Sequence, residues 1–155
     1  MVGLAGACPA WAAGTATTTF NVTATVMQNC AVSAADLAFG NYDAGSGTAI
    51  TASTTLQVTC TPSLSYTVAL DGGMTTHDPA NRAMTDTGHA NNLTYGLYTT
   101  SGYGTIWGDG TGGTSTQGDI GNGTAKPMTV YGRIPGSQFV PAGGYSDRVT
   151  VTVSY

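Results

Sequence analysis

Hydrophobic and polar residues alternate along residues 20–26, shortly before Cys30. An extended chain places alternate side chains on opposite sides, so this period of two predicts a strand with one apolar and one polar face. The apolar face carries Phe20, Val22, Ala24 and Val26. Such a strand needs a hydrophobic surface to cover it, either in its own domain or in a neighbouring molecule.

Short alternating segments recur along the rest of the chain, separated by Gly, Pro, Asn and Asp, which end strands and form turns. The predicted strands are residues 36–42, 50–60, 66–70, 82–85, 93–98, 128–134 and 147–155. Cys60 falls on the inward face of its strand. Seven or so short strands in one chain predict an all-β domain, an immunoglobulin-like β-sandwich.

The composition supports this fold class and narrows the possible partners. Glu is absent and charged residues make up 8% of the 155 residues, against roughly 25% in an average domain. Helix formers are therefore scarce, and Gly, Thr and Val disfavour a helical period. The net charge of -4 and the pI near 4.5 leave no basic patch for phosphates, so nucleic acid and anionic membranes are not expected partners.

The first dozen residues differ in kind from the rest. Residues 1–10 are mostly small and apolar, and Ala10-Trp11-Ala12 fits the small-x-small rule of signal peptidase. We therefore expect residues 1–12 to be the remnant of a secretory signal peptide. Residues 13–26 would be an N-terminal extension that contains the alternating strand, and residues 27–155 the domain. No other apolar run approaches the ~18 residues of a membrane span, so membrane insertion is not expected.

The cysteines indicate one disulfide. Cys8 lies in the predicted signal segment, which leaves Cys30 and Cys60 as a pair. In an oxidising compartment they would close a loop of about 30 residues, worth roughly 3 to 4 kcal/mol in a chain-entropy estimate. Two buried free thiols are the alternative. No metal or cofactor is expected, because His77 and His89 lie in loop-like surroundings and lack ligand spacing.

The last predicted strand continues to Tyr155. A sandwich that lacked one further strand would expose a groove in its core, which is a costly defect in an isolated domain. Apolar residues of its first and last strands would line the groove, and from the last strand we expect Val149, Val151, Val153 and Tyr155. The strand 20–26 has the apolar face that such a groove needs, so we expect it to fill the groove of a neighbouring molecule. The alternative is that residues 20–26 form the first strand of their own domain.

Several motifs follow one another in a specific order along the mature chain. They include Phe39-Gly40-Asn41-Tyr42, Val58-Thr59-Cys60, Ile106-Trp107-Gly108-Asp109-Gly110 and Val130-Tyr131-Gly132-Arg133-Ile134-Pro135. Together with the alternating strand that leads to Cys30, they resemble the spore coat protein U domain family, which looks like the major pilin of archaic chaperone-usher pili.

The resemblance implies an immunoglobulin-like fold that lacks its last strand and is completed by donor-strand complementation. A periplasmic chaperone would lend one strand, and at an outer-membrane usher the N-terminal strand of the next subunit would replace it. The product would be a homopolymer, an extracellular fimbria for adhesion and biofilm formation. The donor residues would be Phe20, Val22, Ala24 and Val26, and the Tyr155 carboxylate would bind basic residues of the chaperone.

Two other kinds of protein remain possible at this point. The chain could be a single-domain adhesin or lectin-like module, in which exposed Tyr98, Tyr103 and Trp107 would meet a ligand, or a secreted coat or matrix protein that forms no pilus. The loop 108–114 lacks the carboxylates of a calcium loop and the Lys of a P-loop, so we expect a turn beside a packed Trp107. An enzyme is not expected, because no nucleophile elbow or other catalytic motif is present.

Overall fold

The structure is a computed structural model that describes residues 3, 6 and 13–155. Apart from Gly3 and Gly6, the predicted signal remnant 1–12 lies outside the described residues. The described part is all-β, as predicted, with one short helix. Its elements are β1 (Cys30–Ala34), β2 (Ile50–Cys60), β3 (Ser65–Leu70), α1 (Gly73–Thr76), β4 (Ala83–Asp86), β5 (Asn92–Thr94), β6 (Gly96–Tyr98), β7 (Gln117–Ile120), β8 (Lys126–Ile134), β9 (Tyr145–Ser146) and β10 (Val151–Ser154).

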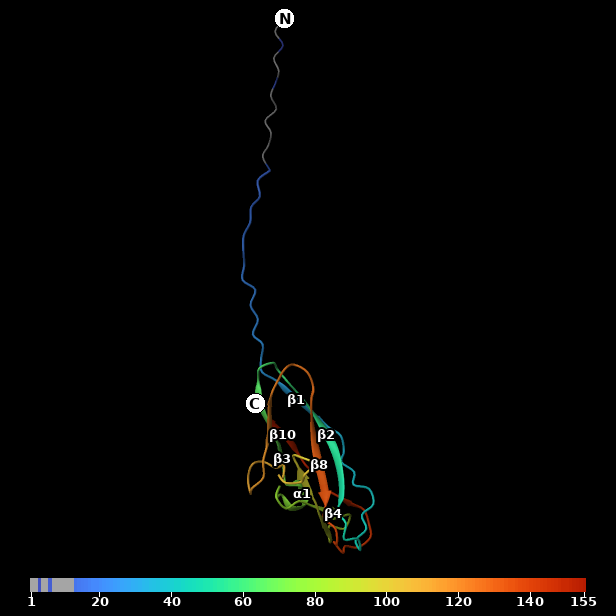
Figure 1. Cartoon of the computed structure of the whole chain (residues 1–155). Coiled ribbons are helices and arrows are strands. Elements are labelled where there is room, and N and C mark those ends of the chain that lie inside the picture. Colours follow the sequence, from blue (N-terminus) through green and yellow to red (C-terminus); the bar gives the residue numbers. More distant parts are fainter. Residues whose placement is uncertain (1–2, 4–5, 7–12) are drawn as a thin grey trace.

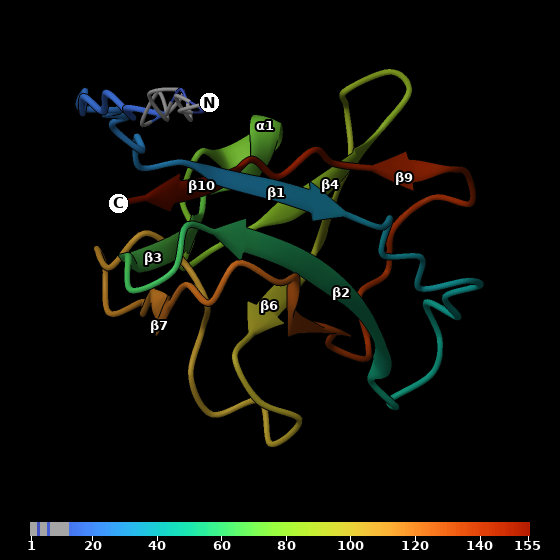
Figure 2. The ribbon, with the colours of Figure 1, turned by 90° about the horizontal axis from the view of Figure 1, so that it is seen from above.

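The strands form two layers (Figures 1 and 2). One layer is a four-stranded sheet in the order β1-β2-β8-β6, and the other contains the sheet β10-β3-β7. A small sheet, β5-β4-β9, continues the second layer, because β9 pairs with β4 just before the chain enters β10 and pairs with β3. All strand pairs of the described residues are antiparallel.

The core lies between the layers, where alternate residues of the long strands are buried. Leu56, Val58 and Cys60 of β2 face the core, as the alternation predicts. Trp107 lies at its centre, and its Nε1 donates a hydrogen bond to the Val68 carbonyl (3.0 Å). The Trp indole therefore satisfies its one polar group while its ring fills the space between the sheets.

Two predicted strands are interrupted for identifiable reasons. The segment 93–98 divides into β5 and β6 because Tyr95 leaves one sheet for the other, and its N–H donates to the Arg82 carbonyl (3.0 Å). The segment 147–155 is a strand only from Val151 to Ser154. In the residues just before β10, aspartate carboxylates accept hydrogen bonds from backbone N–H groups. The Met74 N–H donates to Asp147 (2.9 Å), and the Thr150 N–H donates to Asp71 (2.8 Å).

The prediction of a strand at residues 36–42 is wrong, since the structure has no strand there. Leu37 and Phe39 of this segment nevertheless pack against the core. The pattern also missed β7, whose sequence Gln-Gly-Asp-Ile does not alternate, and the four-residue helix α1. No helix of the described residues is long and apolar enough to cross a membrane.

Candidate functional site

The core of the sandwich is open along the seam between β1 and β10. Both are edge strands, they lie near each other, and they belong to different sheets (Figure 2). Val32 of β1 points inward and is 40% exposed, whereas Val58, its partner in the β1–β2 register, is 1% exposed. Val151 of β10 is likewise only partly buried, although its partner Leu70 is fully buried. Inward-facing apolar side chains therefore reach solvent on both edges.

Two adjoining cavities extend along this seam, with volumes of about 530 and 740 Å³. Both are lined by Leu37, Phe39, Met84 and Tyr145, so they form one continuous depression, which we call the groove. One wall of the groove is residues 34–44, and the other is residues 140–149 with Val151. Buried core residues form its floor: Leu56, Leu70, Leu93, Tyr95, Leu97, Val130 and Ile134. The groove thus has an apolar floor, and its walls carry polar as well as apolar residues.

Side chains, rather than a strand ladder, hold the wall at residues 35–44 in place. The Phe39 ring packs over Gly132 of β8, where an added Cβ would lie 2.7 Å from the Phe39 Cζ atom. The same ring meets the Tyr95 ring edge-to-face at 6.3 Å. Farther along, the Tyr42 hydroxyl donates to the Pro135 carbonyl (2.9 Å) and accepts from the Gln138 N–H (2.9 Å). Glycine at position 132 makes room for the aromatic ring that shapes the groove.

A polar cluster secures the opposite wall. The Tyr95 hydroxyl donates to Oδ2 of Asp147 (2.7 Å), whose Oδ1 accepts from the Met74 N–H (2.9 Å). Burial, followed by the hydrogen bond to Asp147, raises the pKa of Tyr95 well above its ordinary value, so the phenol remains a donor. Gly73 has a positive φ of 75°, and a Cβ there would lie 2.0 Å from Asp147 Oδ2. Only glycine fits at this position.

Behind this wall lies Arg82, a charged residue that is buried. Its Nε donates to the Asp71 carbonyl (2.8 Å), and its Nη2 donates to the carbonyls of Leu70 (3.1 Å) and Trp107 (2.9 Å). Burial lowers the pKa of Arg82, while the nearby Tyr95 and Asp71 oppose that shift. Arg82 thus donates to three backbone carbonyls where β3 ends. The sequence pattern around Arg82 indicates only a short strand, so it gave no sign that this residue would be buried and hydrogen-bonded.

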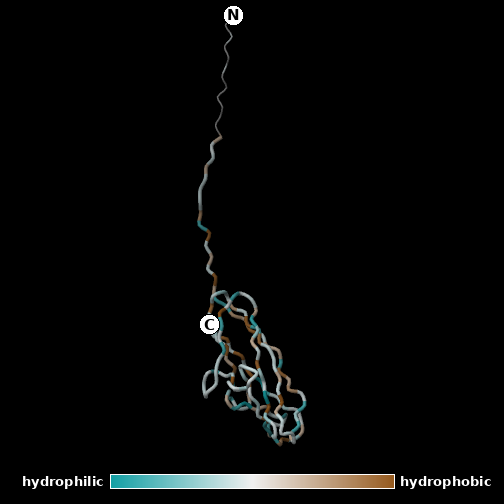
Figure 3. The backbone as a smooth tube through the Cα atoms, viewed as in Figure 1, coloured by the Kyte–Doolittle hydropathy of each residue, from teal (hydrophilic) through white to brown (hydrophobic). Residues whose placement is uncertain are grey.

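Residues 13–29, which we call the tail, extend away from the domain (Figures 1 and 3). The Phe20 side chain is 85% exposed, and Val22, Ala24 and Val26 are also exposed. No residue of the tail is charged. β1 begins at Cys30, a little later than the boundary near residue 27 that we expected. The apolar side chains of the tail are therefore free to contact a surface outside the body of the domain.

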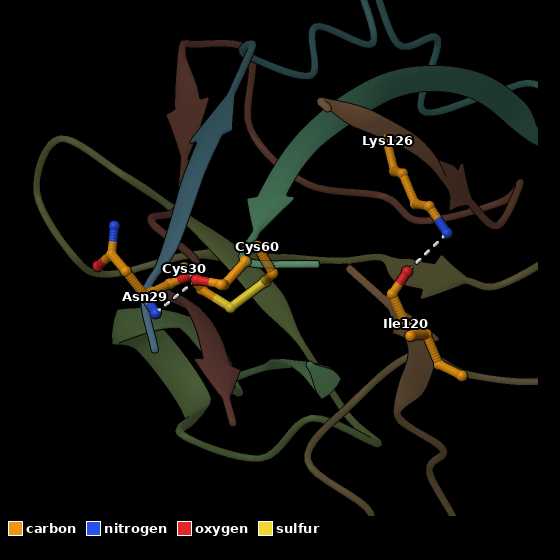
Figure 4. The surroundings of a disulfide bond; sticks show 6 residues. Asn29, Cys30, Cys60, Ile120 and Lys126 are labelled. Carbon is orange, nitrogen blue, oxygen red and sulfur yellow. Dashed lines mark hydrogen bonds between the residues drawn. A yellow bond between two sulfur atoms is a disulfide. The ribbon is translucent and has the colours of Figure 1, made fainter. Parts of the chain in front are cut away.

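The disulfide between Cys30 and Cys60 is confirmed, and the alternative of two free thiols is wrong (Figure 4). The two cysteines are partners in the β1–β2 register. Next to them, the Thr61 N–H donates to the Asn29 carbonyl (2.9 Å), and the Asn29 N–H donates to the Thr61 hydroxyl (2.9 Å). The tail leaves the domain at this point, so the disulfide covalently fastens the base of the tail to β2.

The structure separates the four residues that we predicted from the last strand. Val149 and Val151 line the groove. Val153 packs against the core nearer the end of β10, and Tyr155 is exposed beyond it. The contributions of Leu37 and Phe39 were not predicted. Their alternation within residues 36–42 was the signal that could have identified them.

The aromatic residues expected to serve a ligand-binding module are placed differently. Trp107 is 1% exposed, so the expectation that it meets a ligand is wrong, while the prediction of a packed Trp107 is right. Tyr98 and Tyr103 pack edge-to-face at 5.4 Å, and the Arg133 guanidinium lies 5.6 Å from the Tyr103 ring. In the loop 108–114 the Asp109 carboxylate accepts from the Thr111 N–H (2.9 Å), as in an ordinary turn. Among the described residues, no three His, Cys or Asp side chains come together as metal ligands would.

Fold and groove together define an all-β sandwich with an open seam and an exposed apolar tail. The Spore Coat Protein U domain matches residues 16–152, and the chain belongs to that family. It is 32% identical over 157 residues to Protein U of Myxococcus xanthus, an alignment that covers 92% of this chain and 87% of the relative. The family resemblance seen in the sequence is therefore confirmed.

A solved structure shows the same fold. It is the chaperone–tip adhesion subunit pre-assembly complex CsuC–CsuE from the archaic chaperone-usher Csu pili of Acinetobacter baumannii. One chain of this complex superimposes with a TM-score of 0.61 and 25% sequence identity over 84% of the present chain. The present chain spans 40% of the length of that chain. The likeness confirms the immunoglobulin-like fold class and relates the protein to subunits of chaperone-usher pili.

Proposed function

We propose that the chain is a structural pilus subunit that polymerises by donor-strand exchange into a surface fibre for adhesion and biofilm formation. The observation that carries this proposal is the open seam between the edge strands β1 and β10, with the groove that continues from it, in a domain whose tail presents an alternating apolar face. Edge strands readily accept an added strand, because their free N–H and C=O groups can pair with it. The tail of one subunit completes the sandwich of the next.

The tail is long enough to form a strand, and its alternating apolar face suits the apolar floor of the groove. Residues 20–26 would extend over about 20 Å as a strand, at roughly 3.3 Å per residue. Their apolar side chains would leave water for the groove, contributing on the order of 5 to 8 kcal/mol before backbone pairing is counted. The intervening polar residues Asn21, Thr23 and Thr25 would face solvent and carry no charge that needs a partner.

Each predicted site residue has a role in this proposal. Phe20, Val22, Ala24 and Val26 are the donor residues, and residues 27–155 form the acceptor domain. Val149 and Val151 line the groove, and Val153 extends the same edge strand toward Tyr155. Leu37 and Phe39 supply the opposite wall, which the sequence did not reveal.

The partners follow from the open groove. An isolated domain with an exposed core needs cover before it polymerises, and the Csu complex pairs a pilus subunit with a chaperone. We propose that a periplasmic chaperone first occupies the groove here too, with the Tyr155 carboxylate as an anchor, and that an outer-membrane usher exchanges the chaperone strand for the tail of the next subunit. The protein would then pass through the periplasm into an extracellular fimbria. A tail that can be donated favours a place in the shaft.

A charge placed on the apolar face of the tail tests the proposal. Phe20→Asp would bring a carboxylate into the groove, where burial without a partner is costly. We expect a soluble, chaperone-bound subunit and no fibres by electron microscopy. The matched control is Asn21→Asp, which places the same charge on the solvent face and should leave fibres intact. Fibres of normal length from the Phe20→Asp variant would refute the donor role.

A further inference from the structure

Phe139 is a large apolar residue that the domain holds in solvent. Its side chain is 82% exposed. The preceding residue is fixed, because Gln138 accepts from the Thr94 N–H (2.8 Å) and donates to the Thr94 carbonyl (2.9 Å). The following residue, Val140, lines the groove. The Phe139 ring is therefore exposed on a loop whose neighbouring residues are held in place, directly beside the groove.

The domain has a second exposed apolar residue of this kind at its opposite end. Met27, in the last part of the tail, is 77% exposed. It lies near the pair Cys30–Cys60, whereas Phe139 follows β8, whose last residue Ile134 pairs with Ile50 at the other end of the sheet. Figure 1 shows the tail at one end of the domain and the loop after β8 at the other. Met27 and Phe139 are thus exposed apolar residues at opposite ends of the subunit.

The way in which subunits meet rests on the strand exchange proposed above. The short connection between the tail and β1 then determines at which end of the acceptor's groove the incoming domain must lie. β1 and β10 run in opposite directions (Figure 2), so a strand between them is parallel to one and antiparallel to the other in either orientation. Residues 27–29 connect Val26 to Cys30 and span only about 10 Å. The incoming domain must therefore sit directly at the end of the groove from which its tail emerges.

The two ends differ in what already lies beside them. At the Cys30 end the acceptor's own tail leaves its domain, so an incoming domain there would compete with that tail for space. At the Phe139 end nothing of the described chain projects in this way. Entry from the Phe139 end also repeats the same head-to-tail contact in every subunit, as an open filament requires.

We propose that Phe139 is a contact between successive subunits and that it receives Met27 of the incoming copy of this chain. With Val26 in the groove at the Phe139 end, Met27 follows it on the outward face of the strand and emerges beside the loop. A flexible thioether against an aromatic ring is a favourable contact. The contact covers two exposed apolar residues that the isolated domain leaves in water.

Paired cysteines in the full chain test the contact. Fibres of the Met27→Cys, Phe139→Cys double variant, oxidised and run without reductant, should give a ladder of covalent oligomers, while either single variant should not. The comparison pair is Met27→Cys with Asn122→Cys, since Asn122 is exposed and the adjacent Gly123 N–H donates to the Cys60 carbonyl at the tail end. A ladder from that pair, or none from either pair in intact fibres, would overturn the proposal. Absence of fibres from the unmodified chain would instead refute strand exchange itself.

Fibre stability provides a second measurement. Phe139→Ala should speed the release of subunits from preformed fibres by about tenfold or more. Thermal unfolding of the monomer should not change, because the side chain is exposed there. Phe139→Leu, which keeps most of the apolar surface, should restore slow release. Equal release rates for the alanine variant and the unmodified chain would contradict the contact.

Discussion

Replacing Phe20 by Ala isolates the contribution of the tail to the fibre. The side chain is 85% exposed and lies outside the body of the domain. Truncation should therefore leave the thermal unfolding of the monomer unchanged. In the fibre, by contrast, this side chain would pass from water into the groove. The whole effect of the substitution should appear in the junction between subunits.

The size of the effect follows from burial. Removing a buried Phe side chain costs about 3 to 5 kcal/mol when its site cannot collapse, and the groove floor is made of closely packed core residues such as Leu56 and Val130. Taking about 3 kcal/mol as the lower bound, and 1.4 kcal/mol per factor of ten, subunit release should become roughly 100-fold faster.

Preformed fibres incubated in guanidinium chloride provide the assay. Released subunits are separated by sedimentation and quantified over time, with Asn21→Ala as the matched control on the solvent face of the tail. Asn21→Ala should release subunits at the unmodified rate. Release from Phe20→Ala fibres at that same rate, or a matching loss of stability in the monomer, would refute the assignment of Phe20 to a neighbour's groove.

Two further predictions concern the acceptor domain. Cys30→Ser should lower the yield of periplasmic subunit and its thermal stability, because the loop of about 30 residues is no longer closed, a loss of roughly 3 to 4 kcal/mol; a thermal midpoint that does not change when reductant is added would contradict this. The second prediction concerns Asp71. Burial tends to raise the pKa of its carboxyl, but the hydrogen bonds from Thr150 and Gly73 and the charge of Arg82 lower the pKa overall. A lowered folded-state pKa stabilises the fold above the unfolded value of about 3.9, and that stability is lost as the pH falls through the folded value. Between about pH 5 and 2 the thermal midpoint should therefore fall more steeply for the unmodified chain than for Asp71→Asn; parallel curves would show that Asp71 does not contribute.

Local pattern was sufficient for much of the fold and for part of the groove. The alternation in residues 50–60 and 128–134 identified the two long central strands, because each is buried on one face only. The same rule predicted a strand at residues 36–42 and assigned the wrong backbone, since Phe39 is held by Gly132 and Tyr95 rather than by a paired strand. Periodicity reports which side chains are buried, and it does not report what the backbone is bonded to.

Tertiary contacts account for the features that the pattern could not show. Arg82 is buried where three carbonyls from two separate segments, residues 70–71 and Trp107, converge on it, and no local signal carries that information. The segment just before β10 is held to distant parts of the fold by aspartate side chains, because Asp147 accepts from the Met74 N–H and Asp71 accepts from the Thr150 N–H.

The sequence by itself determined the all-β class, the disulfide pair, the family and the alternating tail, because each depends on residue type and short spacing. Only the tertiary structure showed that β1 and β10 lie near each other as unpaired edges, and that inward residues such as Val32 are exposed there. The physical reason is that an open seam is a relation between two segments more than a hundred residues apart. Each edge strand looks like ordinary core in its own sequence, and its exposure depends on what the rest of the chain leaves uncovered.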